Sequence, residues 1–263
     1  MQKRGQMTVF VIIGILLVII IGIIFYLYGN KLKVQTEEEV KFDSSSIDSI
    51  KTFIQDCINK NSLDAVNLVG KHGGEIQPLF YQSWCYPETR TCDKISYLCY
   101  TTEYSSCYNK KPFLKDYAEK EIYNYMKSKL NNCIDLEKFR NSGFNIEKNG
   151  ELKFNVSIGD YATIVNVNYP LTISKGDSSL KLDKFSKQID VPLGRLIKNA
   201  ESLVLLAQQN PSYNSFAEAL IFASNGELEI ERKIFDDTDI YITKLRNNPY
   251  KFQFAIQSFV RNI

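Results

Sequence analysis

An unbroken apolar stretch near the start of the chain, Val9 to Tyr28, constrains the protein more than any other sequence feature. It reads VFVIIGILLVIIIGIIFYLY and contains no charged residue. A helix of about 20 residues rises about 30 Å, which matches the hydrocarbon core of a bilayer. Because an isolated segment in lipid must satisfy its own backbone hydrogen bonds, the sequence predicts one transmembrane helix over residues 9–28.

The flanking charges predict the orientation of this helix. Lys3 and Arg4 precede it with no acidic residue nearby, whereas Lys31 and Lys33 on the other side are soon followed by the acidic run 37–39. Positive charge on the short N-terminal side favours a cytoplasmic N-terminus. A cleaved signal peptide is the alternative, but its apolar core would be shorter and would end in a small-residue site, which this chain lacks.

The cysteines point to the same orientation, because all six follow the helix. They are Cys57, Cys85, Cys92, Cys99, Cys107 and Cys133. An even number of cysteines on one side of a membrane is typical of disulfides formed in an oxidising compartment. Since no Cys-x-x-Cys pair is present, we expect no structural zinc site.

The positions of the cysteines predict part of their pairing. Cys57 and Cys133 each occupy a Cys-Ile step near the end of a predicted helix, so we expect them to pair. The four cysteines between 85 and 107 then pair among themselves in a disulfide-stapled loop. Short loop closure favours Cys85 with Cys92 and Cys99 with Cys107, and the two other pairings stay open, as do free buried thiols.

The N-terminal residues carry a family resemblance. Lys3-Arg4-Gly5-Gln6-Met7-Thr8 runs directly into the apolar helix and resembles the archaeal class III, or prepilin-type, signal. The resemblance implies cleavage between Gly5 and Gln6 and packing of the hydrophobic helix in a filament core. The family often has Glu where this chain has Phe10. The layout also resembles archaeal single-pass surface proteins with an RGQ-type start.

Changes in composition and in hydrophobic period divide the chain into five segments. They are a cytoplasmic N-terminus (1–8), the transmembrane helix (9–28), an acidic membrane-proximal stalk (29–46), a helical, disulfide-rich region (47–142) and an α+β region with antiparallel strands (143–263). The last boundary is where apolar residues change from helical spacing to alternation. The predicted fold class is therefore α+β, with helices packed on antiparallel sheets in a disulfide-containing ectodomain.

The element predictions follow from the same patterns. Helices are expected over 47–58, from Ser62 to Val69, over 115–133, over 192–209 and over 215–223. Strands are expected in a hairpin around Asn149-Gly150 and over 162–173, 180–191, 227–235, 240–245 and 250–259. Pro170 is expected to place the end of its strand at a sheet edge. Asp236–Asp239 is read as a β-turn in preference to a cation site.

Catalytic chemistry is not indicated. His72 is the only histidine, which excludes a histidine-based triad, and we expect it to end a helix. The chain has no Gly-x-Ser-x-Gly, phosphate-loop or zincin motif, so no catalytic residue, metal or cofactor is predicted. A carboxylate pair from distant segments would be needed for a surface enzyme.

The predicted function is a structural or adhesion-like interaction role at the cell surface. The expected partners are the lipid bilayer and other surface proteins or a second copy of the chain. The alternative is a type IV pilin-like filament subunit. No basic stripe suggests nucleic acid. The 16 Tyr and 16 Phe residues suggest core packing or a tyrosine-rich recognition surface, and Asn155-Val156-Ser157 is an N-glycosylation sequon.

Overall fold

The computed structural model describes residues 44–86, 90–209, 221 and 224–258. The predicted transmembrane helix, the Gly5–Gln6 junction and most of the predicted stalk lie outside these residues. Within the described ranges, no helix combines the length and apolar character needed to cross a membrane. The chain separates into the units 1–44 and 45–263, and the architecture below belongs to the second unit.

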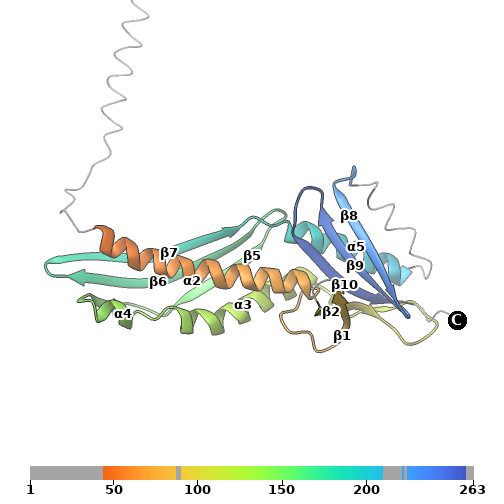
Figure 1. The fold of residues 1–263 in the computed structure, drawn as a ribbon, viewed down its shortest axis with the longest axis horizontal. Helices are drawn as coiled ribbons and strands as arrows, with labels where there is room; N and C mark the ends of the chain where they lie inside the picture. Colours follow the sequence, from red (N-terminus) through yellow and green to blue (C-terminus); the bar gives the residue numbers. More distant parts are fainter. Residues whose placement is uncertain (1–43, 87–89, 210–220, 222–223, 259–263) are drawn as a thin grey trace, which may run out of the picture. The chain divides into compact units, whose positions relative to one another are not determined.

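A six-stranded mixed sheet forms one part of the α+β fold (Figure 1). Its strands are β1 (Tyr81–Tyr86), β2 (Thr91–Tyr100), β3 (Tyr108–Asn109), β8 (Leu228–Phe235), β9 (Thr238–Leu245) and β10 (Lys251–Gln257). The order is β1-β2-β10-β9-β8, with β3 also paired to β2. The β2–β10 pair is parallel and the other pairs are antiparallel, and the sheet curves into a half-barrel.

A second, antiparallel sheet contains β4 (Asn145–Lys148), β5 (Lys153–Ile158), β6 (Thr163–Lys175) and β7 (Ser178–Ile189). The long strand β6 is central: β7 pairs along one side of it, and β4 and β5 follow one another along the other side. From Thr163 to Ile173, every second residue of β6 is buried. One face of this sheet therefore faces the core and the other faces solvent.

The hairpin predicted around Asn149-Gly150 is wrong, because β4 and β5 pair with β6 and not with each other. Pro170 explains the difference: it lies at an irregularity in β6 and has no N–H to donate. The backbone N–H of Asn149 donates to the Pro170 carbonyl at 2.9 Å. A Cβ on Gly150 would lie 2.8 Å from the Pro170 ring. The segment between β4 and β5 therefore passes close to Pro170, and the chain continues along the same side of β6. Pro170 thus lies inside a central strand and not at a sheet edge.

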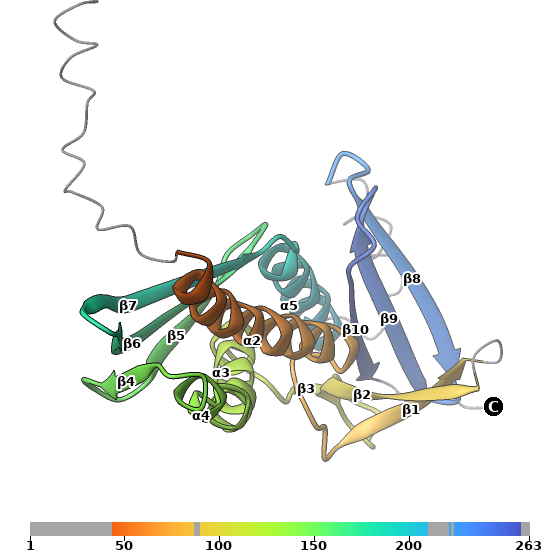
Figure 2. The same cartoon turned by 60° about the vertical axis from the view of Figure 1, so that its left-hand side comes forward.

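Among the described residues, three long helices and one short helix lie against the two sheets, as Figure 2 shows. They are α2 (Ser44–Lys71), α3 (Leu114–Cys133), α4 (Glu137–Arg140) and α5 (Leu193–Gln209). α3 lies against β5, where the Tyr123 and Phe154 rings stack at 4.6 Å, and α5 packs against β10, β9, β2 and β3. α2 is one helix and not the two predicted, because the Ser62 hydroxyl bonds the Asn59 carbonyl at 3.0 Å inside the helix and does not cap a new one.

The segment from Cys85 to Cys107 contains strands, which corrects the prediction of a stapled loop. β2 runs through its centre, and its residues Ile95 to Cys99 are all buried. Because these side chains are covered on both faces of the sheet, the sequence shows no alternation there. Regions 47–142 and 143–263 therefore contribute strands to one sheet, where β2 and β10 meet.

The disulfides connect the cysteines as the sequence predicted. Cys57–Cys133 joins α2 to α3 with the Cα atoms 5.9 Å apart, Cys85–Cys92 crosses the β1–β2 hairpin, and Cys99–Cys107 joins β2 to the segment before β3. No free cysteine remains, since all six cysteines lie in described segments. The structure therefore has one disulfide between residues distant in sequence and two disulfides between residues close in sequence.

The C-terminal turn of α2 lies directly on the start of β10. The Tyr250 hydroxyl donates to the Val66 carbonyl at 2.7 Å. A Cβ on Gly70 would lie 2.6 Å from the Tyr250 hydroxyl oxygen and 2.7 Å from the Lys251 carbonyl oxygen. Gly70 therefore permits an approach of helix to strand that a larger residue would prevent. Burial raises the pKa of Tyr250.

We expect the two classes of disulfide to differ in their contribution to stability. Cys57 and Cys133 are 76 residues apart in sequence, so the chain-entropy model gives about 4–5 kcal/mol for Cys57→Ala/Cys133→Ala. For Cys85→Ala/Cys92→Ala, with a separation of 7, it gives about 2–3 kcal/mol. Urea denaturation of the domain formed by residues 45–263 measures both values. Equal losses would contradict the loop-length explanation.

Stability should fall at alkaline pH because of Tyr250. Its folded pKa lies above the unfolded value near 10, so its contribution is complete below about pH 10 and is lost as pH rises further. In Tyr250→Phe, the fall in unfolding free energy above about pH 10.5 should be shallower by about 1.4 kcal/mol per pH unit. Denaturation from pH 9 to 11.5 tests this, with the exposed Tyr108→Phe as a control. An unchanged slope in Tyr250→Phe would refute it.

Candidate interaction surface

An exposed aromatic patch lies where the chain enters β1 and crosses the β2–β3 ladder. We define the aromatic patch as Leu79, Phe80, Tyr97, Tyr100 and Tyr108. The Phe80 ring lies 4.9 Å from the Tyr97 ring and 4.7 Å from the Tyr100 ring, and these two tyrosines are 5.0 Å apart. Tyr108 is the partner of Tyr100 in the ladder between β2 and β3. The patch is therefore assembled from strands β2 and β3 and the loop that precedes β1.

The outer members of the aromatic patch are open to solvent. Leu79 is 96% exposed, Phe80 45% and Tyr108 64%. Tyr97 lies beneath them and is only 7% exposed. Exposed large apolar side chains that cluster next to a buried aromatic residue are typical of binding sites, because their burial against a partner is favourable.

A polar network fixes the base of the patch. The Tyr97 hydroxyl donates to the Gln82 side-chain oxygen at 2.9 Å and lies 3.0 Å from the Thr238 hydroxyl oxygen. These contacts tie β2 to β1 and to β9. Burial raises the pKa of Tyr97, and the Thr238 hydrogen bond opposes part of that effect. Tyr97 is thus held in one position beneath Phe80.

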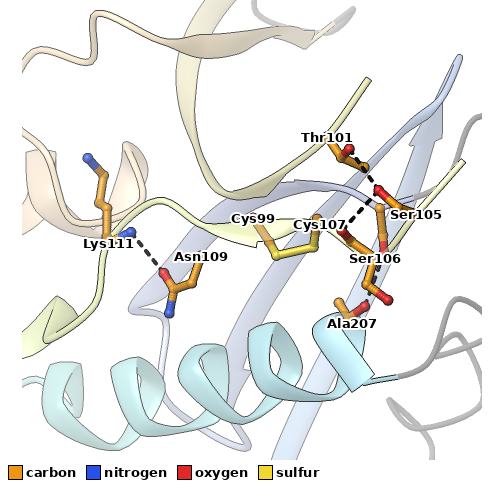
Figure 3. The surroundings of a disulfide bond; sticks show 9 residues. Cys99, Thr101, Ser105, Ser106, Cys107, Asn109, Lys111 and Ala207 are labelled. Carbon is orange, nitrogen blue, oxygen red and sulfur yellow. Dashed lines mark hydrogen bonds between the residues drawn. A yellow bond between two sulfur atoms is a disulfide. The ribbon is translucent and has the colours of Figure 1, made fainter. Parts of the chain in front are cut away.

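One disulfide lies directly beside the aromatic patch. Cys99–Cys107 joins β2 to the segment before β3 (Figure 3), and in sequence Cys99 directly precedes Tyr100 and Cys107 directly precedes Tyr108. Cys85–Cys92 locks the far end of the β1–β2 hairpin. In the loop between Cys99 and Cys107, the Thr101 and Ser105 hydroxyl oxygens lie 3.4 Å apart. The backbone next to Tyr100 and Tyr108 is therefore covalently constrained, which lowers the ordering cost of binding.

A second polar cluster, centred on Glu75, joins α2, β2 and α3. Lys111 Nζ lies 2.5 Å from Glu75 Oε1, and the Tyr117 hydroxyl donates to the same oxygen at 2.9 Å. The Ser96 hydroxyl donates to the other carboxylate oxygen. The Lys111 and Glu75 side chains are only 12% and 13% exposed. Burial, followed by the hydrogen bond to Glu75, raises the pKa of Tyr117. Because its groups are paired with one another, we assign this cluster a structural role.

The structure places the other candidate residues apart from one another. His72 directly follows the last residue of α2, as expected, with Nδ1 2.9 Å from the Ile76 carbonyl oxygen. Asp236 and Asp237 form the predicted turn between β8 and β9, and Asp239 pairs with Arg232 at 2.7 Å. Among the described residues, no group of three or more His, Cys, Asp or Glu side chains is placed to hold a metal ion.

The N-glycosylation sequon lies apart from both the aromatic patch and the Glu75 cluster. Asn155 is exposed on β5, in the second sheet. The sequence did not locate the aromatic patch, because β2 lies in the segment Cys85–Cys107, which was expected to be a stapled loop. The abundance of tyrosine was the one signal that pointed toward it.

Comparison of the chain with protein-family models, with curated proteins and with solved structures finds no match.

Proposed function

We propose that this chain is a membrane-anchored cell-surface protein whose extracellular domain has a structural or interaction role. The observation that carries the proposal is the pairing of all six cysteines in three disulfides. Such bonds form and persist in oxidising compartments and are rare where thiols are kept reduced. They support an ectodomain outside the cytoplasmic membrane.

The apolar segment 9–28 supplies the anchor in this proposal. Its length suits one crossing of a bilayer, and Lys3 and Arg4 favour a cytoplasmic N-terminus. The domain from residue 45 onward then lies outside, joined to the anchor by the acidic segment 29–46. The lipid bilayer is the first partner of the protein.

The aromatic patch supports binding of a protein surface. Aromatic side chains are enriched in the centres of protein interfaces, and rigid rings lose little conformational entropy on binding. Phe80 and Leu79 supply apolar contact area, while the hydrogen bonds of Tyr97 and the Cys99–Cys107 disulfide hold the rings beneath them in place. The partner chemistry that fits is an apolar surface of another cell-surface protein or of a second copy.

A pilin-like filament subunit is the alternative proposal. Its support is the sequence Lys3 to Thr8 directly before the apolar segment. In that case the mature chain begins at Gln6 and the apolar helix packs against copies of itself. A simple anchor keeps Met1, so the mass of the N-terminal peptide from native membranes discriminates between the two.

We expect protease added to intact cells to remove the domain beyond residue 45, because the proposed topology exposes it. The measurement is an immunoblot against a tag at the C-terminus, with a cytoplasmic protein as the control for intact cells. A domain that survives in intact cells and is digested only after lysis would reverse the topology.

We expect a photo-crosslinking residue at position 79 to yield products on intact cells, because Leu79 is 96% exposed beside the rings. The same residue at position 127, exposed on α3, is the matched control. Phe80→Ser should reduce the yield at position 79, since it removes the central ring. Mass spectrometry separates products containing a second copy from those containing another surface protein. Equal yields at positions 79 and 127 would rule out the aromatic patch.

A further inference from the structure

The solvent face of the second sheet is hollowed. Polar side chains line the hollow together with Phe154, Val167 and Phe185, and most of its exposed lining is apolar. The hollow has a volume of about 570 Å³, within the range of ligand pockets. The outward side chains that line it are amides, a hydroxyl and two amines. They are Lys153 and Asn155 of β5, Asn166 and Asn168 of β6, and Lys184 and Ser186 of β7. Among these described residues, no acidic side chain lines the hollow.

The strand register orders these side chains in two rows across the sheet. Lys153 lies opposite Asn168, which lies opposite Lys184. In the next row, Asn155 lies opposite Asn166, whose side-chain oxygen accepts a hydrogen bond from Ser186 at 2.8 Å. The Asn155 side chain makes no such bond to another residue that the structure describes, so its amide nitrogen remains accessible.

The sequence marks the same asparagine. Asn155-Val156-Ser157 is the one Asn-x-Ser/Thr triplet of the chain without proline in the middle, since Asn210 is followed by Pro211. Asn155 and Ser157 are both exposed and, two residues apart on a strand, share one face. Phe154, between Lys153 and Asn155, stacks on Tyr123 of α3 on the opposite face. Both required side chains of the sequon therefore point away from the core.

We infer that Asn155 carries an N-linked glycan whose first sugars lie in this hollow. The inference rests on the proposed function, because transfer occurs on the outer side of the membrane. The donor is an oligosaccharide linked through phosphate to a lipid. Asn155 Nδ2 forms a bond to the anomeric carbon of the sugar, the carbon–oxygen bond to phosphate breaks, and the lipid-linked phosphate leaves with the bonding electrons. The amide loses one proton to a base of the transferase.

The lining suits sugars for two physical reasons. Amide side chains both donate and accept, as sugar hydroxyls do, so Asn166 and Asn168 can satisfy the hydroxyls of a sugar attached one strand away. The aliphatic stems of Lys153 and Lys184 give the sugar rings apolar contact, and their amines donate at the rim. A glycan fixed in the hollow would cover this sheet face and leave the aromatic patch, on the other sheet, uncovered.

The first test is the mass of the peptide containing Asn155, from chain purified from its native membranes. We expect a sugar mass on Asn155, its loss in Ser157→Ala and its retention in Ser157→Thr, which restores the sequon. Ser186→Ala is the matched control, because it removes a hydroxyl from the same face and leaves the sequon intact. An unmodified Asn155 on a domain that protease removes from intact cells would overturn this inference while the proposed function stands. A domain protected in intact cells would instead overturn the proposed function.

A double-mutant cycle tests whether the hollow holds the sugars. Removing the glycan by Ser157→Ala should lower Tm by less in an Asn168→Ala background than in the wild type, with a difference of about 2 °C or more. The matched cycle of Ser157→Ala with Lys127→Ala, a lysine on α3, should be additive. Additivity at Asn168 as well would overturn the contact between glycan and hollow.

Discussion

The parallel pairing of β2 with β10 is the constraint on which the half-barrel depends. Tyr97, Cys99 and Tyr100 of β2 lie in register with Ala255, Ile256 and Gln257 of β10. On one side of this pair stand β1 and β3, from the first half of the domain, and on the other stand β9 and β8 from its end. A parallel pair cannot be closed by a short turn, so the intervening chain must form a long connection. Here that connection contains α3, the whole second sheet and α5.

Packing between the two sheets follows from this arrangement. α2 ends against β10 through Gly70 and Tyr250, and its partner α3 continues along β5 of the second sheet. The Cys57–Cys133 bond fixes the two helices to each other. The Glu75 cluster joins the end of α2 to β2 and α3 at the same junction. The aromatic patch takes its rigidity from strands that this junction holds in place.

Elements with a regular pattern could be predicted from the sequence. α3 and α5 have apolar residues at helical spacing, and β8, β9 and β10 are separated by the turn residues Asp236-Asp237 and Asn247-Asn248-Pro249. The Cys57–Cys133 disulfide was predictable because the two cysteines share a local context, whereas the short loops between the other four favoured their local pairing without excluding the two alternatives. The elements that were missed depend on tertiary contacts: β2 is buried on both faces, Ser62 bonds within its own helix, and Pro170 lies in a central strand. The aromatic patch was missed with β2, since its rings converge only when β1, β2 and β3 pair.

The β2–β10 pairing also has a consequence for folding while the chain is being synthesised. A chain is synthesised from its N-terminus, so β1, β2 and β3 emerge long before β10 exists to cover them. During that interval the future β10 side of β2 has unpaired backbone groups, and Ile95 and Leu98 lack the layer that later buries them. Such edges attract other strands. The local bonds Cys85–Cys92 and Cys99–Cys107 need no later part of the chain, so they can form early and hold this hairpin in shape until β10 pairs with β2.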